Sequence, residues 1–209
     1  MKANEIFNSF VSEDDFKADD FEKTYSKTKG EITKVVARLR GNESRSFTQA
    51  ARHYERIQRH EEKLKAMRDK LNSEMKDRMA EIFTAEEAVL TRVMETASLT
   101  MTLSAQKPSS KVNHEKVLED LLALAPELES KVAELVEKHT KVTTPAARLG
   151  KPKTKLVKDS VEPEHINEAS LGEFWEKVKA FGKKVLANTM SWARSYDAKL
   201  DSIKQRAGL

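Results

Sequence analysis

The sequence predicts a mainly α protein built from long helices, and three observations lead to this. About half of the 209 residues are Ala, Glu, Lys, Arg or Leu, a composition typical of long helices. No glycine or proline occurs between Gly41 and Pro108, and helix interiors tolerate both poorly. Apolar residues recur at steps of three, four and seven, the spacing of one helix face. We therefore expect a long central helix with a helical hairpin at its N-terminal end, one short β element near 98–104, and a C-terminal amphipathic helix.

The central helix is expected to run from residue 47 to about 96, after a capping box at Ser46–Gln49. A helix of this length is on the order of 75 Å long, and no short neighbour can cover its apolar stripe. Long exposed stripes generally mark interfaces, so we expect a homo-oligomer or attachment to a larger assembly. The expected interface residues are Ile57, Leu64, Leu71, Met75, Ile82, Val89 and Val93.

Residues 1–45 form an acidic N-terminal segment, in which residues 1–23 carry seven acids and three lysines. A weaker apolar face predicts a helix over about 13–40, and Gly41-Asn42 is a typical stop signal. The simplest arrangement is a hairpin, with this helix folded back on the start of the long one.

Residues 46–140 hold the long helix, a short strand and two short helices. Leu99, Met101 and Leu103 alternate with Ser and Thr, a period of two that predicts a strand. Asn113 is expected to cap a helix that runs to about residue 124, and Pro126 to start the next.

Residues 141–167 are predicted to be a basic linker, because three prolines and a glycine lie among scattered lysines. These cations can neutralise phosphates without reading sequence, and no aromatic residue interleaves with them for base stacking. A solvated linker is the alternative. The candidate nucleic-acid residues are Arg148, Lys151, Lys153, Lys155 and Lys158.

Residues 168–209 are predicted to form an amphipathic helix that starts at a capping box, Ser170–Glu173. Its acidic residues disfavour an anionic lipid surface, and Gly182 in mid-helix indicates close approach of another backbone. We expect it to dock on protein: its own long helix, a second copy or an external partner. The expected anchors are Phe174, Trp175, Phe181, Trp192 and Tyr196.

Several classes of chemistry lack their usual signals. The chain has no cysteine, no glycine-rich phosphate loop, and no apolar run of membrane-spanning or signal-peptide length. His53 and His60 are seven residues apart, which is about 10 Å on a straight helix and too far for one metal ion. We expect a non-enzymatic protein of the cytoplasm with no metal and no cofactor.

Residues 64–142 resemble small helical accessory and structural proteins of tailed bacteriophages. The features are a charged helix rich in Met and Leu, the Ser/Thr-alternating segment 96–106, and the helix that follows at 112–124. The resemblance implies a phage gene product of virion-assembly or DNA-handling type, located in the host cytoplasm or the virion. We expect a helical structural or assembly protein. The alternatives are a nucleic-acid-binding accessory protein, and an inhibitor or adaptor of a host protein.

Overall fold

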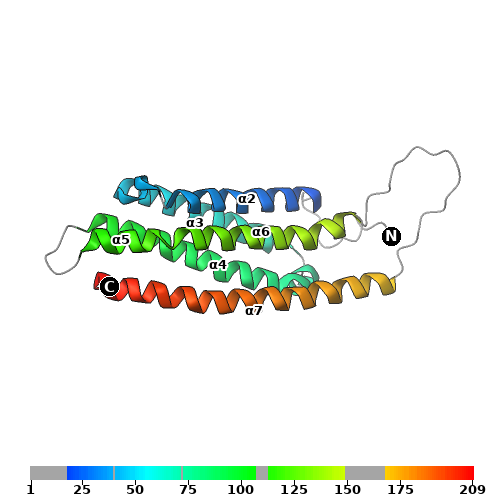
Figure 1. Ribbon diagram of the computed structural model, residues 1–209. Coiled ribbons are helices and arrows are strands. Elements are labelled where there is room, and N and C mark those ends of the chain that lie inside the picture. Colours follow the sequence, from blue (N-terminus) through cyan, green and yellow to red (C-terminus); the bar gives the residue numbers. More distant parts are fainter. Residues whose placement is uncertain (1–17, 40, 72, 107–112, 149–167) are drawn as a thin grey trace.

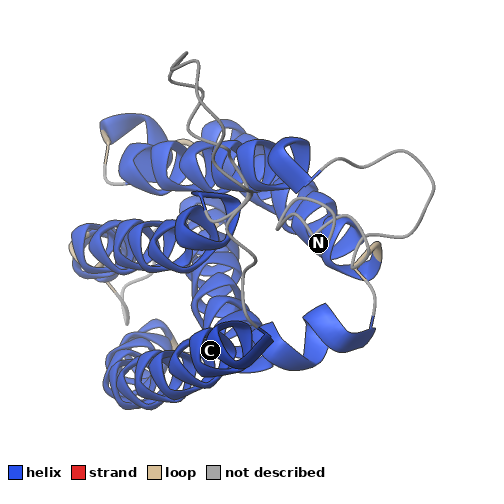
Figure 2. Cartoon of the chain, turned by 90° about the vertical axis from the view of Figure 1, so that its right-hand side faces the viewer, coloured by secondary structure: helices blue, strands red, loops and turns tan. Residues whose placement is uncertain are grey.

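The computed structural model describes residues 18–39, 41–71, 73–106, 113–148 and 168–209. This part of the chain is mainly helical, as the sequence predicts, and its long helices run along an elongated bundle (Figure 1). Figure 2 shows the same helices from one end of the bundle. The elements are α2 (Ala18–Leu39), η1 (Asn42–Arg45), α3 (Phe47–Asp69), α4 (Ser73–Ala105), α5 (His114–Leu122), α6 (Ala125–Arg148) and α7 (Glu168–Ala207).

Helices α2 and α3 pack against each other as the expected hairpin, joined by the short helix η1. The Ser44 hydroxyl donates to the Arg38 carbonyl at the end of α2, 3.0 Å away, and lies 3.3 Å from Nδ1 of His53 on α3. Ser44 and His53 are both buried, so these hydrogen bonds fix the connection between α2 and α3 in the protein interior. Ser46 occupies the N-cap position of α3 as predicted, although its side chain makes no capping hydrogen bond.

The prediction of one helix from 47 to about 96 is wrong, because the chain turns back between α3 and α4. The backbone N–H of Leu71 bonds to the Arg68 carbonyl at 3.1 Å, after the last residue of α3. Asn72 and Ser73 follow, and both residue types favour turns and helix starts. The turn lets the apolar stripes of α3 and α4 bury each other, which a straight rod cannot do.

The β element near 98–104 is also wrong, since these residues continue α4 to Ala105. The buried side chains there are Thr96, Ala97, Thr100 and Leu103, which share a helical face. The Thr100 hydroxyl bonds to the Thr96 carbonyl one turn earlier at 2.7 Å. Hydroxyls satisfied in this way let a Ser/Thr-rich segment stay helical, although its alternation resembles a strand.

Helices α5 and α6 follow one another closely along the chain, and α6 packs mainly against α2. Asn113 caps α5 as expected, because its side chain accepts from the Lys116 backbone N–H at 3.1 Å. Helix α6 continues through Pro145 to Arg148, so residues 141–148, the first part of the predicted linker, are helical.

Helix α7 packs along α4 and touches α5, so the expected C-terminal helix docks on its own chain. It starts at Glu168, two residues before the predicted capping box. A side-chain carbon added at Gly182 would lie 3.3 Å from Cβ of Glu81, so α7 packs closely on α4 at this position. The nearest atoms belong to the side chains of Glu81 and Ile82, and not to a backbone as predicted. At 1.5 Å per residue, the 40-residue helix is about 60 Å long.

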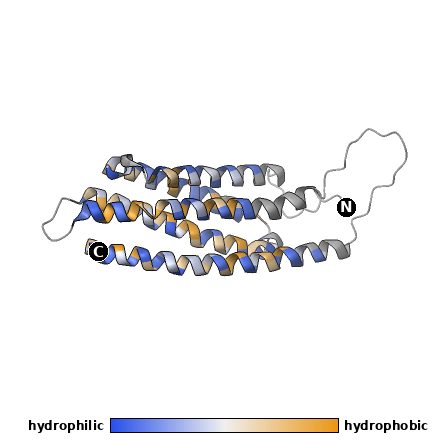
Figure 3. Cartoon of the chain, in the orientation of Figure 1, coloured by the Kyte–Doolittle hydropathy of each residue, from blue (hydrophilic) through white to orange (hydrophobic). Residues whose placement is uncertain are grey.

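The interior is one continuous core to which every long helix contributes. Hydrophobic and hydrophilic positions are interspersed along the coloured helices (Figure 3). Within the described residues, no helix combines the length and the apolar character that a membrane span requires.

Candidate functional site

A buried polar cluster links α2, α3 and α4. It consists of Tyr25 and Lys29 on α2, Arg68 on α3 and Glu86 on α4. The Tyr25 hydroxyl donates to Oε2 of Glu86 at 2.5 Å, and Nη2 of Arg68 donates to the same oxygen at 3.0 Å. Lys29 donates to Oε1 of Glu86, and Nε of Arg68 donates to the Tyr25 hydroxyl at 2.6 Å. Glu86 is thus the acceptor at which three donors from two other helices meet.

The cluster is almost closed to water, since Tyr25, Lys29 and Glu86 are 0%, 4% and 3% exposed. Burial, and next the Glu86 carboxylate, raise the pKa of Tyr25 well above its ordinary value, so its hydroxyl stays protonated. Burial lowers the pKa of Lys29 from 10.5 to about 8, against the opposing pull of Glu86. The ammonium of Lys29 also lies 4.5 Å from the centre of the Tyr25 ring, a cation–π contact.

A small cavity of about 20 Å³ borders the cluster, which is room for about one water molecule. Four helices line it: α2 with Lys29 and Ile32, α3 with Leu64, α4 with Glu86, Val89 and Leu90, and α6 with Val132 and Leu135. Most of these side chains are apolar, and the two charged ones already pair with each other. The arrangement therefore suits a clamp that fixes the positions of three helices.

Sequence reasoning missed this cluster, although a signal was present. Lys29 lies between Tyr25 and Ile32 on the apolar face of α2, and Glu86 lies between Ile82 and Val89 on that of α4. A charged residue at a core position of a helical stripe needs a partner from another helix. Lys29 and Glu86 are a base and an acid, each within an apolar stripe, so the sequence alone could have indicated that they pair.

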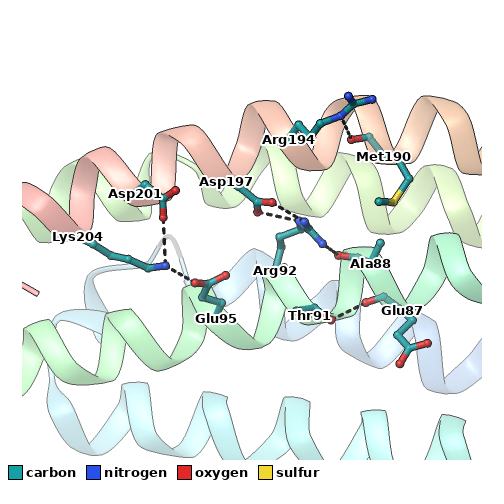
Figure 4. A network of polar contacts seen from close by, with 10 residues as sticks. All are labelled: Glu87, Ala88, Thr91, Arg92, Glu95, Met190, Arg194, Asp197, Asp201 and Lys204. Carbon is teal, nitrogen blue, oxygen red and sulfur yellow. Dashed lines mark hydrogen bonds and ion pairs between the residues drawn. The ribbon is translucent and has the colours of Figure 1, made fainter.

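A second set of polar contacts ties α7 to α4, as Figure 4 shows, and a further ion pair ties α7 to α5. Arg92 of α4 forms a two-pronged ion pair with Asp197, with N–O distances of 2.9 and 2.5 Å. Lys204 of α7 pairs with Glu95, which lies one turn after Arg92 on α4. Arg206 of α7 pairs with Asp120 of α5 at 2.5 Å. These pairs fix the register of α7 along its neighbours.

Six of the seven residues predicted as an oligomer interface lie in the core of the single chain. These six are at most 4% exposed: Ile57, Leu64, Leu71, Ile82, Val89 and Val93. The seventh, Met75, lies on α4, but its side chain is outside the described part. The stripe is covered by α2, α6 and α7 packing around the α3–α4 pair. The exposed stripe that led us to expect self-association is therefore absent from these six positions.

The predicted docking residues of α7 face their own chain where the structure describes them. Tyr196 is fully buried and its hydroxyl lies 2.9 Å from that of Thr96. Trp192 donates from its indole nitrogen to Glu127 of α6 at 3.0 Å. Phe181 and Trp175 are partly buried against the core, and the guanidinium of Arg78 lies over the Trp175 ring. The side chain of Phe174 is outside the described residues.

The predicted nucleic-acid residues lie mostly outside the described part. Arg148 is the last residue of α6, and Lys151, Lys153, Lys155 and Lys158 fall in the stretch 149–167. Among the residues that the structure describes, no group of three or more His, Asp or Glu side chains is placed to hold a metal ion.

Comparison with known proteins gave no match to a protein family, a curated protein or a solved structure. The resemblance to phage accessory proteins therefore stays a prediction from the sequence.

Proposed function

We propose that this chain is a non-enzymatic structural or assembly protein that works through helix–helix contacts in an oligomer or a larger assembly. The observation that supports the proposal best is that the buried charged groups form ion pairs between helices. Lys29 of α2 and Arg68 of α3 both pair with Glu86 of α4, which holds the three helices in fixed positions. A protein that acts through its shape needs long elements kept in register, and the cluster and the α4–α7 ion pairs provide this.

The resemblance of residues 64–142 to accessory proteins of tailed bacteriophages suggests which assembly this is. A phage particle or an assembly intermediate in the host cytoplasm is the setting we propose. Assembly contacts must use outer faces of the bundle, because the apolar stripe of α3 and α4 is covered from within. An adaptor or inhibitor of a host protein would use the same outer faces, and differs in binding as a single copy.

The test is the mass of the purified full chain in solution, measured by light scattering from about 1 to 100 μM. The proposal expects a multiple of the 23.7 kDa chain mass, or a stable complex with a phage structural protein. A monomer at all concentrations that binds one copy of a host protein would favour the adaptor. A monomer that joins no particle or oligomer would contradict the proposal.

A variant separates assembly contacts from the core. Leu71 is 4% exposed, so Leu71→Asp buries a charge and should unfold the chain rather than dissociate intact subunits. Loss of mass together with loss of helical circular dichroism is the expected result. A folded monomer of Leu71→Asp would mean that the α3–α4 stripe is an interface between chains after all.

A further inference from the structure

Helix α3 carries a row of exposed cations along one flank. Its cations Arg52, Arg56, Arg59 and Lys63 follow steps of four, three and four, which place them on one flank. The exposed acids Glu55, Glu62 and Asp69 lie beside this row on the outer face of α3, and the exposed Lys65 lies beyond them. A flank that carries four cations and no acid between them is a candidate surface for binding an anion.

Helix α2 adds a second row of exposed cations beside the first. Lys27, Lys34 and Arg38 recur at steps of seven and four on one flank of α2. Glu31 lies within this row, and it acts electrostatically on His60 of the neighbouring α3. The two rows therefore lie on either side of the contact between α2 and α3. We call this surface the basic seam: Lys27, Lys34, Arg38, Arg52, Arg56, Arg59 and Lys63.

Electrostatic effects on His60 show how densely the cations are packed. Partial burial lowers its pKa, the Glu31 carboxylate opposes that shift, and Lys63, Arg59 and Arg56 each lower the pKa further. His60 is thus neutral near pH 7, and the charge of the seam comes from its lysines and arginines.

Most cations of the seam have no acidic partner among the described residues. Lys34 pairs with Glu31 at 2.7 Å and Arg59 with Glu55 at 3.5 Å, and Lys27 acts electrostatically on Glu31. The other four, Arg38, Arg52, Arg56 and Lys63, make no ion pair with the described residues. In contrast, the cations between α4 and α7 are paired across the helices. Like charges four residues apart, such as Arg52 and Arg56, destabilise a helix. An external anion would remove this repulsion.

We propose that the basic seam binds the phosphate backbone of duplex nucleic acid without reading the base sequence. Each row spans 11 residues, about 16 Å, and packed helices lie about 8–10 Å apart. Two such rows can contact several phosphates of a duplex, which carries one charge per roughly 1.7 Å of its axis. This goes beyond the proposed assembly function and uses a surface different from the linker after Arg148.

The side chains around the seam favour a duplex over other polyanions. Among the described residues, the large hydrophobic side chains that are exposed are Phe47, Met190 and Leu209, and none belongs to the seam. Proteins that hold single strands stack bases on aromatic rings, and helices that bind lipid surfaces insert apolar side chains. The seam offers charge alone, which is what backbone binding needs.

The test is binding of the full chain to a fluorescent 30-base-pair duplex over a series of salt concentrations. In the seam variant, Arg52, Arg56 and Lys63 are each replaced by Gln. Each lost phosphate contact lowers the log–log salt slope by about 0.9, so the variant should lose about 2.7 and bind at least about ten-fold more weakly near 0.1 M salt. The matched control replaces Lys179, Lys183 and Lys184, exposed on α7, and removes the same charge.

The expected result is that the seam variant loses affinity for all duplex sequences alike, while the α7 control keeps the salt slope of the parent chain. Retained helical circular dichroism shows that the variant is folded. Absence of duplex binding at 50 mM salt, or equal losses in both variants, would overturn the proposal. It would also fail if replacing Lys151, Lys153 and Lys155 in the linker removed the binding and the seam variant did not. Seam-dependent binding to anionic vesicles without binding to the duplex would assign the surface to a membrane instead.

Discussion

Glu86 is the residue on which the packing of three helices depends most. It accepts from Tyr25, Lys29 and Arg68 while being 3% exposed. A buried ion pair adds little when compared with an apolar pair of the same shape, but removing one partner leaves the other charge unpaired. Loss of the carboxylate should therefore cost far more than loss of one donor.

The first prediction compares two substitutions in this cluster. Glu86→Gln leaves two buried cations without their counter-charge and should lower the free energy of unfolding by about 3–5 kcal/mol. Tyr25→Phe removes one hydroxyl and should cost about 1–3 kcal/mol. Urea unfolding followed by circular dichroism measures both. Equal small losses would mean that the cluster is open to water.

The second prediction concerns pH and Lys29. Its folded-state pKa is about 8 and its ordinary value 10.5, so between these values the unfolded chain binds more protons than the folded chain. Stability should then rise with pH from about 8 to 10, by up to about 1 kcal/mol per pH unit. Above that range Tyr25 acts in the opposite direction, because its raised pKa keeps the proton on the folded chain.

The control for this effect is Lys29→Met, measured by urea unfolding at pH 7.5, 8.5 and 9.5. The difference in stability between the parent chain and the variant isolates the contribution of Lys29 from all other titrating groups. That difference should change with pH in favour of the parent chain. A difference that is constant from pH 7.5 to 9.5 would contradict the assigned pKa shift.

At the scale of elements, Gly182 reports how closely α7 packs on α4. An added Cβ would lie 3.3 Å from Cβ of Glu81, whereas Gly172 on the same helix has nothing within 4 Å. Gly172→Ala should stabilise the chain by up to about 1 kcal/mol through helix propensity. Gly182→Ala should gain less, and Gly182→Leu should destabilise by about 1–3 kcal/mol through overpacking. Thermal unfolding compares the three, and a stabilised Gly182→Leu would rule out the close approach.

The helix boundaries show which features of the fold could be predicted from the sequence. Local signals at Gly41, Asn113 and Gly182 predicted the end of α2, the start of α5 and the close packing of α7. Two failures have the same physical origin, namely that tertiary contacts decide between local alternatives. The alternation of apolar and polar residues around Leu99 is typical of a strand. In the helix, the Thr100 hydroxyl instead bonds to the Thr96 carbonyl one turn earlier, so the segment stays helical.

The break after Asp69 lacks the glycine or proline that usually marks one. The break arises because folding back lets the apolar stripes of α3 and α4 bury each other. The periodicity of the sequence does not show which apolar stripes will pack together. The buried cluster was missed for the same reason, since Lys29 and Glu86 are 57 residues apart.

At the scale of the whole molecule, the chain is a bundle that satisfies its own apolar and charged core groups. The fold-back between α3 and α4 is the feature on which this account rests, because it turns an expected rod with an exposed stripe into a covered core. The same turn leaves the basic seam of α2 and α3 on the outside.

The most direct test is the distance between spin labels on α3 and α4, measured by pulsed electron paramagnetic resonance. The chain has no cysteine, so cysteines introduced at Gln58 and Thr91, both exposed, carry the labels alone. Glu61 and Glu87 influence each other electrostatically, which places the two label sites on neighbouring turns of the paired helices. Labelled chains diluted ten-fold with unlabelled ones report the distance within one chain. Packed helices predict less than about 25 Å, whereas an unbroken helix from 47 to 96 would give about 50 Å and contradict the account.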